Sequence, residues 1–200
     1  MSSLSLTPET RYRKAVRARQ AANRALGISH SLTDRQEALR GVQSLYEEGF
    51  GIPALADTLG IHERYLGDVL RGRMTQVRGT TAHRLQSITR SMVLEKANDS
   101  FYVPAIGSRR RVEALMCLGW SQAQIDETAE ALHGVRLHVN ALYRSKSVRA
   151  NRHRRMAEVY EQLALRPGPS AQVKNRSLAR GYAPPLAWDD IDDPNEEPKV

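Results

Sequence analysis

The hydrophobic positions that follow residue 33 recur at the spacing of an amphipathic helix, and a glycine marks the end of the pattern. Thr33 begins this helix, with Gln36 three residues later as in a capping box, and Gly49 ends it. The predicted buried stripe consists of Leu39, Val42, Leu45 and Tyr46.

Three further helices are predicted before residue 93. A short helix covers 53–59, Gly60 makes a turn, and the next helix runs over about 62–71. After a loop at 72–79 that contains glycine, another helix opens at Thr80 or Thr81 and continues to about Met92.

The second half of the chain repeats the helical pattern after a segment rich in turn formers. Asn98, Asp99 and Ser100, with Pro104 and Gly107, predict a linker that we place at 96–107. A second helical set follows, beginning with a helix that ends at Gly119 and whose predicted buried residues are Val112, Leu115, Met116 and Leu118. From residue 166, Pro-Gly-Pro-Ser begins a predicted extended tail with a basic stretch at 174–180 and an acidic end.

The first thirty residues predict a basic helix over 7–26. Thr7, Pro8 and Glu9 supply a helix start signal, and Gly27 ends the helix. Two interpretations stay open: a solvated helix packed loosely on the next one, or an arm laid along the phosphates of a nucleic acid.

Comparison of the two halves indicates a diverged duplication. Gly49-Phe50 matches Gly119-Trp120 at an offset of 70, and Val77-Arg78 matches Val148-Arg149 at an offset of 71. Between these anchors the best offset is 73, which adds about three residues between 122 and 132. Since Ile125, Ala129 and Leu132 keep helical spacing, the simplest interpretation is one extra helical turn.

These patterns predict an all-α fold built from two tandem helix-turn-helix bundles. The bundles occupy 31–95 and 108–165, after an N-terminal basic helix at 1–30 and before an extended, acidic C-terminal tail at 166–200. The composition agrees, because aromatic residues make up only 6% of the chain and a core of Leu, Ala, Val and Ile suits helices.

The charge distribution indicates a polyanionic partner. The overall net charge is +8, but the last twelve residues hold six acidic residues and one lysine, so residues 1–188 carry +13. A body this basic favours nucleic acid, although ribosomal and membrane-surface proteins are equally basic. A single cysteine, Cys117, excludes an intramolecular disulfide. With neither a signal sequence nor a membrane span in the sequence, we expect a cytoplasmic protein, associated with the nucleoid when bound.

Residues 52–71 carry the most specific motif. Relative to Ala56, a glycine lies at +4 (Gly60) and apolar residues lie at +5, +10 and +13 (Ile61, Leu66 and Val69). With Leu55 and Leu59, this spacing resembles the lambda-repressor-like and Cro-like helix-turn-helix family over about twenty residues. An ordinary helical hairpin is the alternative. The chain departs from the family where Ile52-Pro53 replaces the polar residue that usually opens the second helix.

The resemblance implies that the residues after Ile61 enter the major groove of double-stranded DNA. Arg64 would then bridge guanine O6 and N7, and Glu63 or Asp68 would accept from cytosine N4. The exposed positions implied to face the groove are His62, Glu63, Arg64, Asp68 and Arg71. Those suited to phosphate contact are Arg73, Arg78, Thr80, Thr81 and Arg84.

The second unit has a family-like start and an unusual turn. Ser121 is the expected N-cap and Gln122 lies on the first turn, but His133-Gly134 and a longer helix replace the standard turn. Its reading helix would carry Arg136, His138, Asn140, Arg144 and Lys146, with Arg149, Asn151, Arg152 and Arg155 along phosphate. The unit is either a second reader or a degenerate copy serving packing or dimerisation, and its basic exposed residues favour DNA contact.

A second resemblance covers residues 107–122 and the ending at 181–190. Both are similar to small helix-turn-helix proteins of actinobacteria and their phages. This resemblance implies a DNA-binding regulator.

The sequence predicts neither an enzyme nor a metal or cofactor site. Nucleotide-binding loops and CxxC or HExxH motifs are missing, and Cys117 is expected to be inert core. The acidic end is expected to be a solvated tail, or to fold back on the basic surface and compete with DNA.

The functional expectation is therefore a sequence-specific double-stranded DNA-binding protein, a transcriptional regulator or repressor that reads a bipartite site. We expect it to act as a monomer, with a homodimer left open. The alternatives are an accessory DNA-binding component of a recombination or packaging machine, and a helical RNA-binding or protein-interaction module.

Overall fold

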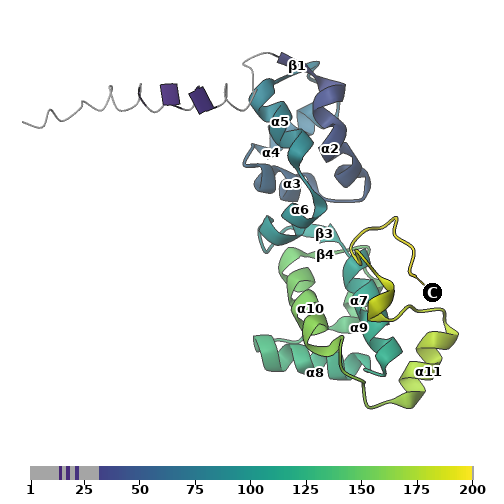
Figure 1. The fold of residues 1–200 in the computed structure, drawn as a ribbon. Coiled ribbons are helices and arrows are strands. Elements are labelled where there is room, and N and C mark those ends of the chain that lie inside the picture. Colours follow the sequence, from purple (N-terminus) through teal and green to yellow (C-terminus); the bar gives the residue numbers. More distant parts are fainter. Residues whose placement is uncertain (1–13, 15–16, 19–20, 23–31, 200) are drawn as a thin grey trace, which may run out of the picture.

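The computed structural model describes residues 14, 17–18, 21–22 and 32–199 (Figure 1). The predicted basic helix at 1–30 lies outside the described residues, apart from those five positions. The described chain is mostly helical, as predicted, but it also contains two small two-stranded antiparallel sheets.

The first half is a helical bundle closed by a short strand pair. Its elements are β1 (Leu32–Asp34), α2 (Arg35–Glu47), α3 (Ile52–Leu59), α4 (Glu63–Leu70), β2 (Gln76–Arg78), α5 (Gly79–Ser87) and α6 (Arg90–Lys96). The predicted helix start at Thr33 is wrong, because Thr33 lies in β1 opposite Val77. Asp34 is the cap instead, and its side chain accepts from the Gln36 amide at 2.8 Å. Tyr46, predicted to be buried, is 42% exposed.

The predicted helix that opens at Thr80 or Thr81 and runs to Met92 is two helices. Ile88 has an extended backbone with ψ of 136° and ends α5, and its side chain is buried in the core. Thr89 then caps α6 by accepting a hydrogen bond from the Met92 amide. Burial of Ile88 at the break explains why the hydrophobic pattern continues smoothly through it.

The predicted linker at 96–107 is wrong, because this segment is packed into the fold. It contains β3 (Tyr102–Pro104), and Ala97, Val103 and Ala105 are buried. β3 pairs with β4 (Ser147–Arg149), with Val103 opposite Val148. The turn formers Asn98 and Ser100 hydrogen-bond to each other, which agrees with a tight turn rather than a free linker.

The second half comprises β3, α7 (Ile106–Leu118), α8 (Gln122–His133), α9 (Val139–Arg144), β4 and α10 (Ala150–Leu163). Strand, three helices, strand and helix therefore occur twice in the same order. The strand pairs coincide at the two offsets seen in the sequence, since β1 to β3 is a shift of 70 and β2 to β4 is a shift of 71. α8 has 12 residues where α3 has 8, which is the predicted extra turn. Leu132 keeps the helical spacing of Ile125 and Ala129, but unlike them it is not buried and is 46% exposed.

The two halves differ where α2 crosses α5 in the first half and α7 crosses α10 in the second. In the first half Ala38 and Ala82 are buried at this crossing, and α5 lies so close that a Cβ on Gly41 would be 2.5 Å from the Gln86 carbonyl oxygen. The same offsets place Ser108, Arg111 and His153 at these three positions in the second half. All three are buried polar residues, so the second crossing needs polar partners that the first does not.

Gly41→Ala should therefore destabilise the first half by about 2 kcal/mol, because the added methyl meets backbone that cannot turn aside. Urea unfolding at pH 7 measures the change, with Arg40→Ala on the exposed side of α2 as the control. A variant as stable as the wild type would contradict the close crossing of α2 and α5.

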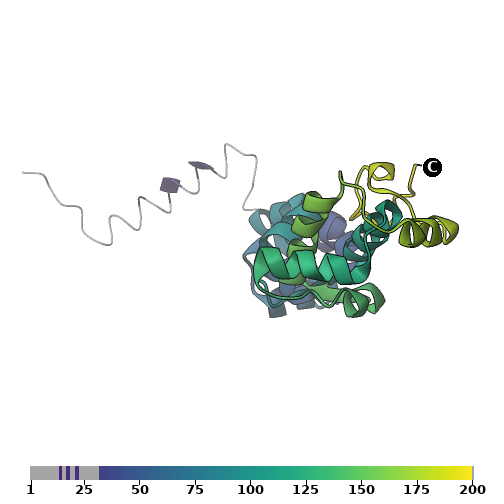
Figure 2. The same cartoon turned by 90° about the horizontal axis from the view of Figure 1, so that it is seen from below.

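The predicted extended tail is also wrong, because the chain after residue 166 folds back on the second half. It forms α11 (Ala171–Ala179) against α7 and a short 3₁₀ turn, η1 (Pro185–Ala187). The acidic residues then contact arginines of α6 and α7. Figure 1 shows this C-terminal segment on the side of the molecule away from α4, and Figure 2 shows the same yellow segment at one edge of the bundle. Folding back therefore occurs, but on a surface other than that of α4.

Candidate nucleic-acid interface

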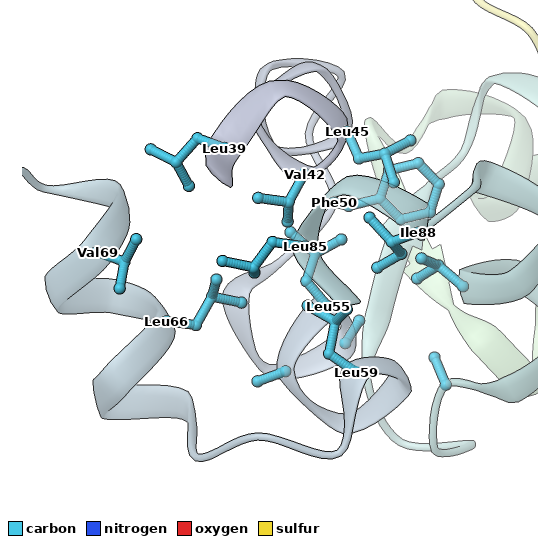
Figure 3. Packing of buried hydrophobic residues seen from close by; sticks show 14 of the residues in the cluster. Leu39, Val42, Leu45, Phe50, Leu55, Leu59, Leu66, Val69, Leu85 and Ile88 are labelled. Carbon is cyan, nitrogen blue, oxygen red and sulfur yellow. The ribbon is translucent and has the colours of Figure 1, made fainter. Parts of the chain in front are cut away.

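The α3–α4 pair is shaped by a left-handed glycine and an apolar contact. Gly60 has φ of +62°, which a side chain would disfavour, and the Ile61 amide donates to the Ala56 carbonyl at 3.0 Å. Leu66 and Val69 are fully buried and point from α4 toward the core formed with Leu55 (Figure 3). One face of α4 is thus held in the core, and the opposite face is left to solvent.

The N-terminal turn of α4 carries the exposed residues predicted to read bases. His62 is the N-cap, and its Nδ1 accepts from the Arg64 amide at 3.2 Å. Glu63 and Arg64 are exposed. The other two predicted positions are engaged on the protein itself. Asp68 pairs with Arg73 at 3.1 Å, and the Arg71 guanidinium lies over Gly67.

The N-terminus of α5 lies beside that of α4. Arg78 is the exposed N-cap of α5, and no side chain caps the free amides of that helix. Thr80 and Thr81 are half-buried on its first turn. His62, Arg78 and Thr81 line one groove of about 530 Å³ with four apolar residues, Leu32, Ile61, Tyr65 and Met74. Residues from α4, β2 and α5 that the sequence reasoning assigned to DNA are thus brought together here.

Two arginines of the first half hold the ends of α3 and α4. Arg84 reaches the carbonyls of Leu59 and Gly60 at 3.4 and 3.5 Å, so part of its donor set faces the turn rather than solvent. Arg35, which the sequence reasoning missed, donates to the carbonyls of Val69 and Leu70 at 2.6 and 2.7 Å. Arg35 therefore anchors the C-terminal end of α4. The sequence does not reveal this role, because Arg35 lies far from α4 along the chain.

The second half has a fully capped α8. Ser121 accepts from the Gln124 amide at 3.3 Å, and the Gln124 side chain accepts from the Ser121 amide at 3.0 Å. The expected N-cap is confirmed, and the capping box occupies both the hydroxyl and the amide of Ser121. Gln122, on the first turn, is half-buried.

The start of α9 is unusual, because His138 adopts φ of +51°. The neighbouring Val139 amide donates to the Asp126 carboxylate of α8 at 3.2 Å, and Arg152 donates to the carbonyls of Leu137 and His138. These contacts hold the α8–α9 turn in a left-handed conformation that is energetically unfavourable for a residue other than glycine. Much of the hydrogen-bonding capacity of Arg152 is used at this turn.

Three exposed polar residues lie on α9 or directly after it. Asn140, Arg144 and Lys146 are exposed. Arg136 pairs with Glu130 at 2.8 Å, and this hydrogen bond raises the pKa of Arg136. Arg149 is the exposed N-cap of α10, again with no side-chain cap, and the residues that follow on α10, Asn151, Arg152 and Arg155, are half-buried.

A second groove, of about 510 Å³, adjoins the C-terminal end of α9. Arg144 lines it together with Arg109 and Arg110 of α7, which the sequence reasoning did not assign to any site. The Tyr143 and Tyr182 hydroxyls meet there at 2.6 Å, and this hydrogen bond raises the pKa of Tyr143 to about 12. In the sequence, the run of three arginines at 109–111 is the feature that could have indicated this groove.

Among the described residues, His, Cys, Asp and Glu form no group of three that would hold a metal ion. Cys117 is buried, and burial raises the pKa of its thiol to about 11, as expected for inert core. Within the described part of the chain, every helix is too short or too polar to cross a membrane.

Comparison of the chain with models of protein families, with curated proteins and with solved structures found no match.

Proposed function

We propose that this chain is a sequence-specific double-stranded DNA-binding protein, acting as a transcriptional regulator, in which α4 and α9 read the two parts of a bipartite site. The main observation in support is the α3–α4 pair. The exposed N-terminus of α4 lies beside the N-terminus of α5, which has no side-chain cap. This is the arrangement that a helix-turn-helix unit of the lambda-repressor-like kind needs.

The first unit offers base and phosphate contacts in one place. A helix fits the major groove of DNA, and Arg64 on the exposed first turn of α4 would donate to guanine O6 and N7. Arg78 and the free amides of α5 would bind a neighbouring phosphate, because a helix N-terminus attracts anions. His62 and Glu63 complete the exposed turn, while Asp68 and Arg71 contribute less because they contact their own chain.

The second unit supports the same role through matching positions. Arg149 occupies the place of Arg78 at the shift of 71, and α10, like α5, has no side-chain cap. Asn140 on α9 would pair with adenine N6 and N7, and Arg144 would contact the backbone. The strong positive charge of residues 1–188 adds the general attraction to phosphate.

Selection from a random duplex library tests the proposal. The wild type should enrich a motif with two parts, and Arg64→Ala should weaken binding to that motif about tenfold and relax the preference in one part. Arg136→Ala combined with Asn140→Ala should relax the other part. Binding should fall with salt, with a slope of about −0.9 per phosphate contacted.

Matched variants remove the same charge elsewhere. Arg40→Ala on the exposed side of α2, and Arg166→Ala combined with Asn175→Ala after α10, should leave the motif unchanged. Enrichment of DNA without any motif would point to an architectural protein of a recombination or packaging machine. Retention of RNA alone, or of neither nucleic acid, would refute the proposal.

A further inference from the structure

We propose that residues 188–199, the C-terminal strap, brace the two halves of the protein against each other and so set the separation of the DNA half-sites that it accepts. This inference rests on the proposed function. The strap is defined by its contacts with arginines of α6 and α7.

Arg90 joins the strap to the first half. From α6, its guanidinium donates to Glu48 at the end of α2 at 3.0 and 3.2 Å. The same guanidinium binds Asp190 at 3.2 Å and Asp193 at 3.1 Å. The Arg90 side chain is only 17% exposed, so water screens these ion pairs less than it screens surface pairs. Burial alone would lower the pKa of Arg90, but its three carboxylate partners raise it.

The strap also contacts the second half, through two arginines of α7. Arg110 donates to the backbone carbonyls of Asp193 and Glu196, and its guanidinium lies 4.3 Å from the centre of the Trp188 ring. Arg111 forms a bidentate pair with Asp192 at 2.5 and 2.9 Å. Because Arg110 and Arg111 belong to α7, the strap connects α7 directly to Arg90.

Besides the strap, α10 also attaches the two halves to each other. Ala150 packs into the core of the first half, and its amide donates to the Phe101 carbonyl at 2.8 Å. Arg154 donates to the Leu94 carbonyl at 2.8 Å and pairs with Asp99. The halves are therefore joined through α10 and also through the strap. The strap thus adds a second attachment, which would restrict rotation of one half against the other.

A fixed orientation has a consequence for a bipartite site. Linked binding units gain affinity only when both engage at once, and the gain is lost when the geometry forbids it. A rigid junction thus restricts the protein to one spacer length, whereas a loosened junction accepts several. The contacts of Arg90 with Asp190 and Asp193 act as positioning contacts for the reading helices.

The test variant is Asp190→Asn combined with Asp193→Asn. It removes the two strap charges that bind Arg90 and leaves Glu48 in place, while the amide oxygens still accept from the Asp192 and Asn195 amides. The matched control is Asp189→Asn combined with Glu197→Gln, which removes the same charge. Asp189 pairs with Lys199 inside the strap, and neither control side chain contacts Arg90 in the described structure.

Two measurements are made on the full chain. Spin labels at Arg40→Cys and Gln162→Cys, in a Cys117→Ala background, report the distance distribution between the halves. We expect the test variant to broaden this distribution about twofold and the control to match the wild type. In parallel, the selected half-sites are presented at varied spacers. Wrong spacers should cost the wild type and the control on the order of 100-fold in affinity, and the test variant about tenfold or less.

The two claims fail separately. If the wild type retains no duplex, the proposed function is refuted, and the spacer claim with it, while the distance measurement still decides whether the strap braces the halves. If the wild type binds a bipartite site but the test variant keeps both the narrow distribution and the spacer preference, the strap is not a brace.

Discussion

Replacing Asp192 with alanine is expected to lower the free energy of unfolding by about 4 kcal/mol, the largest effect of any single strap residue. The Arg111 side chain is only 11% exposed, and its Nε has no hydrogen-bond partner among the described residues. Asp192 is thus the carboxylate that compensates this buried charge. The Asp192 carboxylate also lies against Gly107, where a Cβ would come within 1.7 Å of its Oδ1.

Urea unfolding at pH 7 measures the loss, and a double-mutant cycle identifies its cause. Arg111→Met combined with Asp192→Ala should recover at least half of the lost stability, because the unpaired charge is then gone. Asp189→Ala is the control, since its pair with Lys199 is about 70% exposed and should contribute less than about 1 kcal/mol. If Asp192→Ala and Asp189→Ala are equally mild, the polar crossing does not depend on the strap.

Stability is expected to fall by about 3 kcal/mol as the pH drops from 6.5 to 4, because of His153. Burial lowers the pKa of His153 to about 4. The neighbouring Arg111 and Arg154 also lower this pKa, whereas the carboxylate of Asp192 raises it. The ring lies 3.0 Å from the Ser108 hydroxyl and 3.7 Å from Asp192. Between pH 4 and 6.5 the unfolded chain binds a proton at this position that the folded chain does not, so acid favours unfolding.

The pH slope of a variant isolates this contribution. His153→Ala restores the residue found at the matching position, Ala82, and should remove about 1.4 kcal/mol per pH unit from the slope in that window. Burial would raise the pKa of Asp192, but its hydrogen bonds with Arg111 outweigh this and lower it, so Asp192 adds a second loss below its ordinary range near pH 3.8. Burial raises the pKa of Glu113, so this residue favours the folded state as the pH falls. It does so equally in the wild type and in His153→Ala. A variant with the wild-type slope would place the acid sensitivity elsewhere.

The predictions that succeeded depend on neighbours in the sequence. The bounds of α3 and α4 agree with the expected helices to within about a residue, and Gly60 has the left-handed conformation that the turn required. The offsets of 70 and 71 reappear in the two strand pairs, and the inserted residues form the extra turn of α8. Helical spacing, caps and glycine turns act within a few residues, so the sequence displays them directly.

The predictions that failed depend on partners far along the chain. The sequence predicts a helix start at β1 and a linker at β3, because three-residue strands leave no periodic pattern and exist only through their pairing. For the acidic end the sequence leaves open a solvated tail or one folded back on the basic surface, because the arginines that bind it lie about 80 to 100 residues away. The roles of Arg84 and Arg152 at the turns were hidden for the same reason, as their acceptors lie 25 and 15 residues away.

By itself, the sequence determined that this protein is built of helices, that its second half repeats the first, and where the α3–α4 turn lies. Only the tertiary structure decided how the halves are joined and what the acidic residues do. Arg111 and Asp192 are 81 residues apart, and Arg90 and Asp193 are 103 apart. Which arginine a distant carboxylate meets is settled when the surrounding helices pack and exclude water from the pair, and that choice is made by the whole fold.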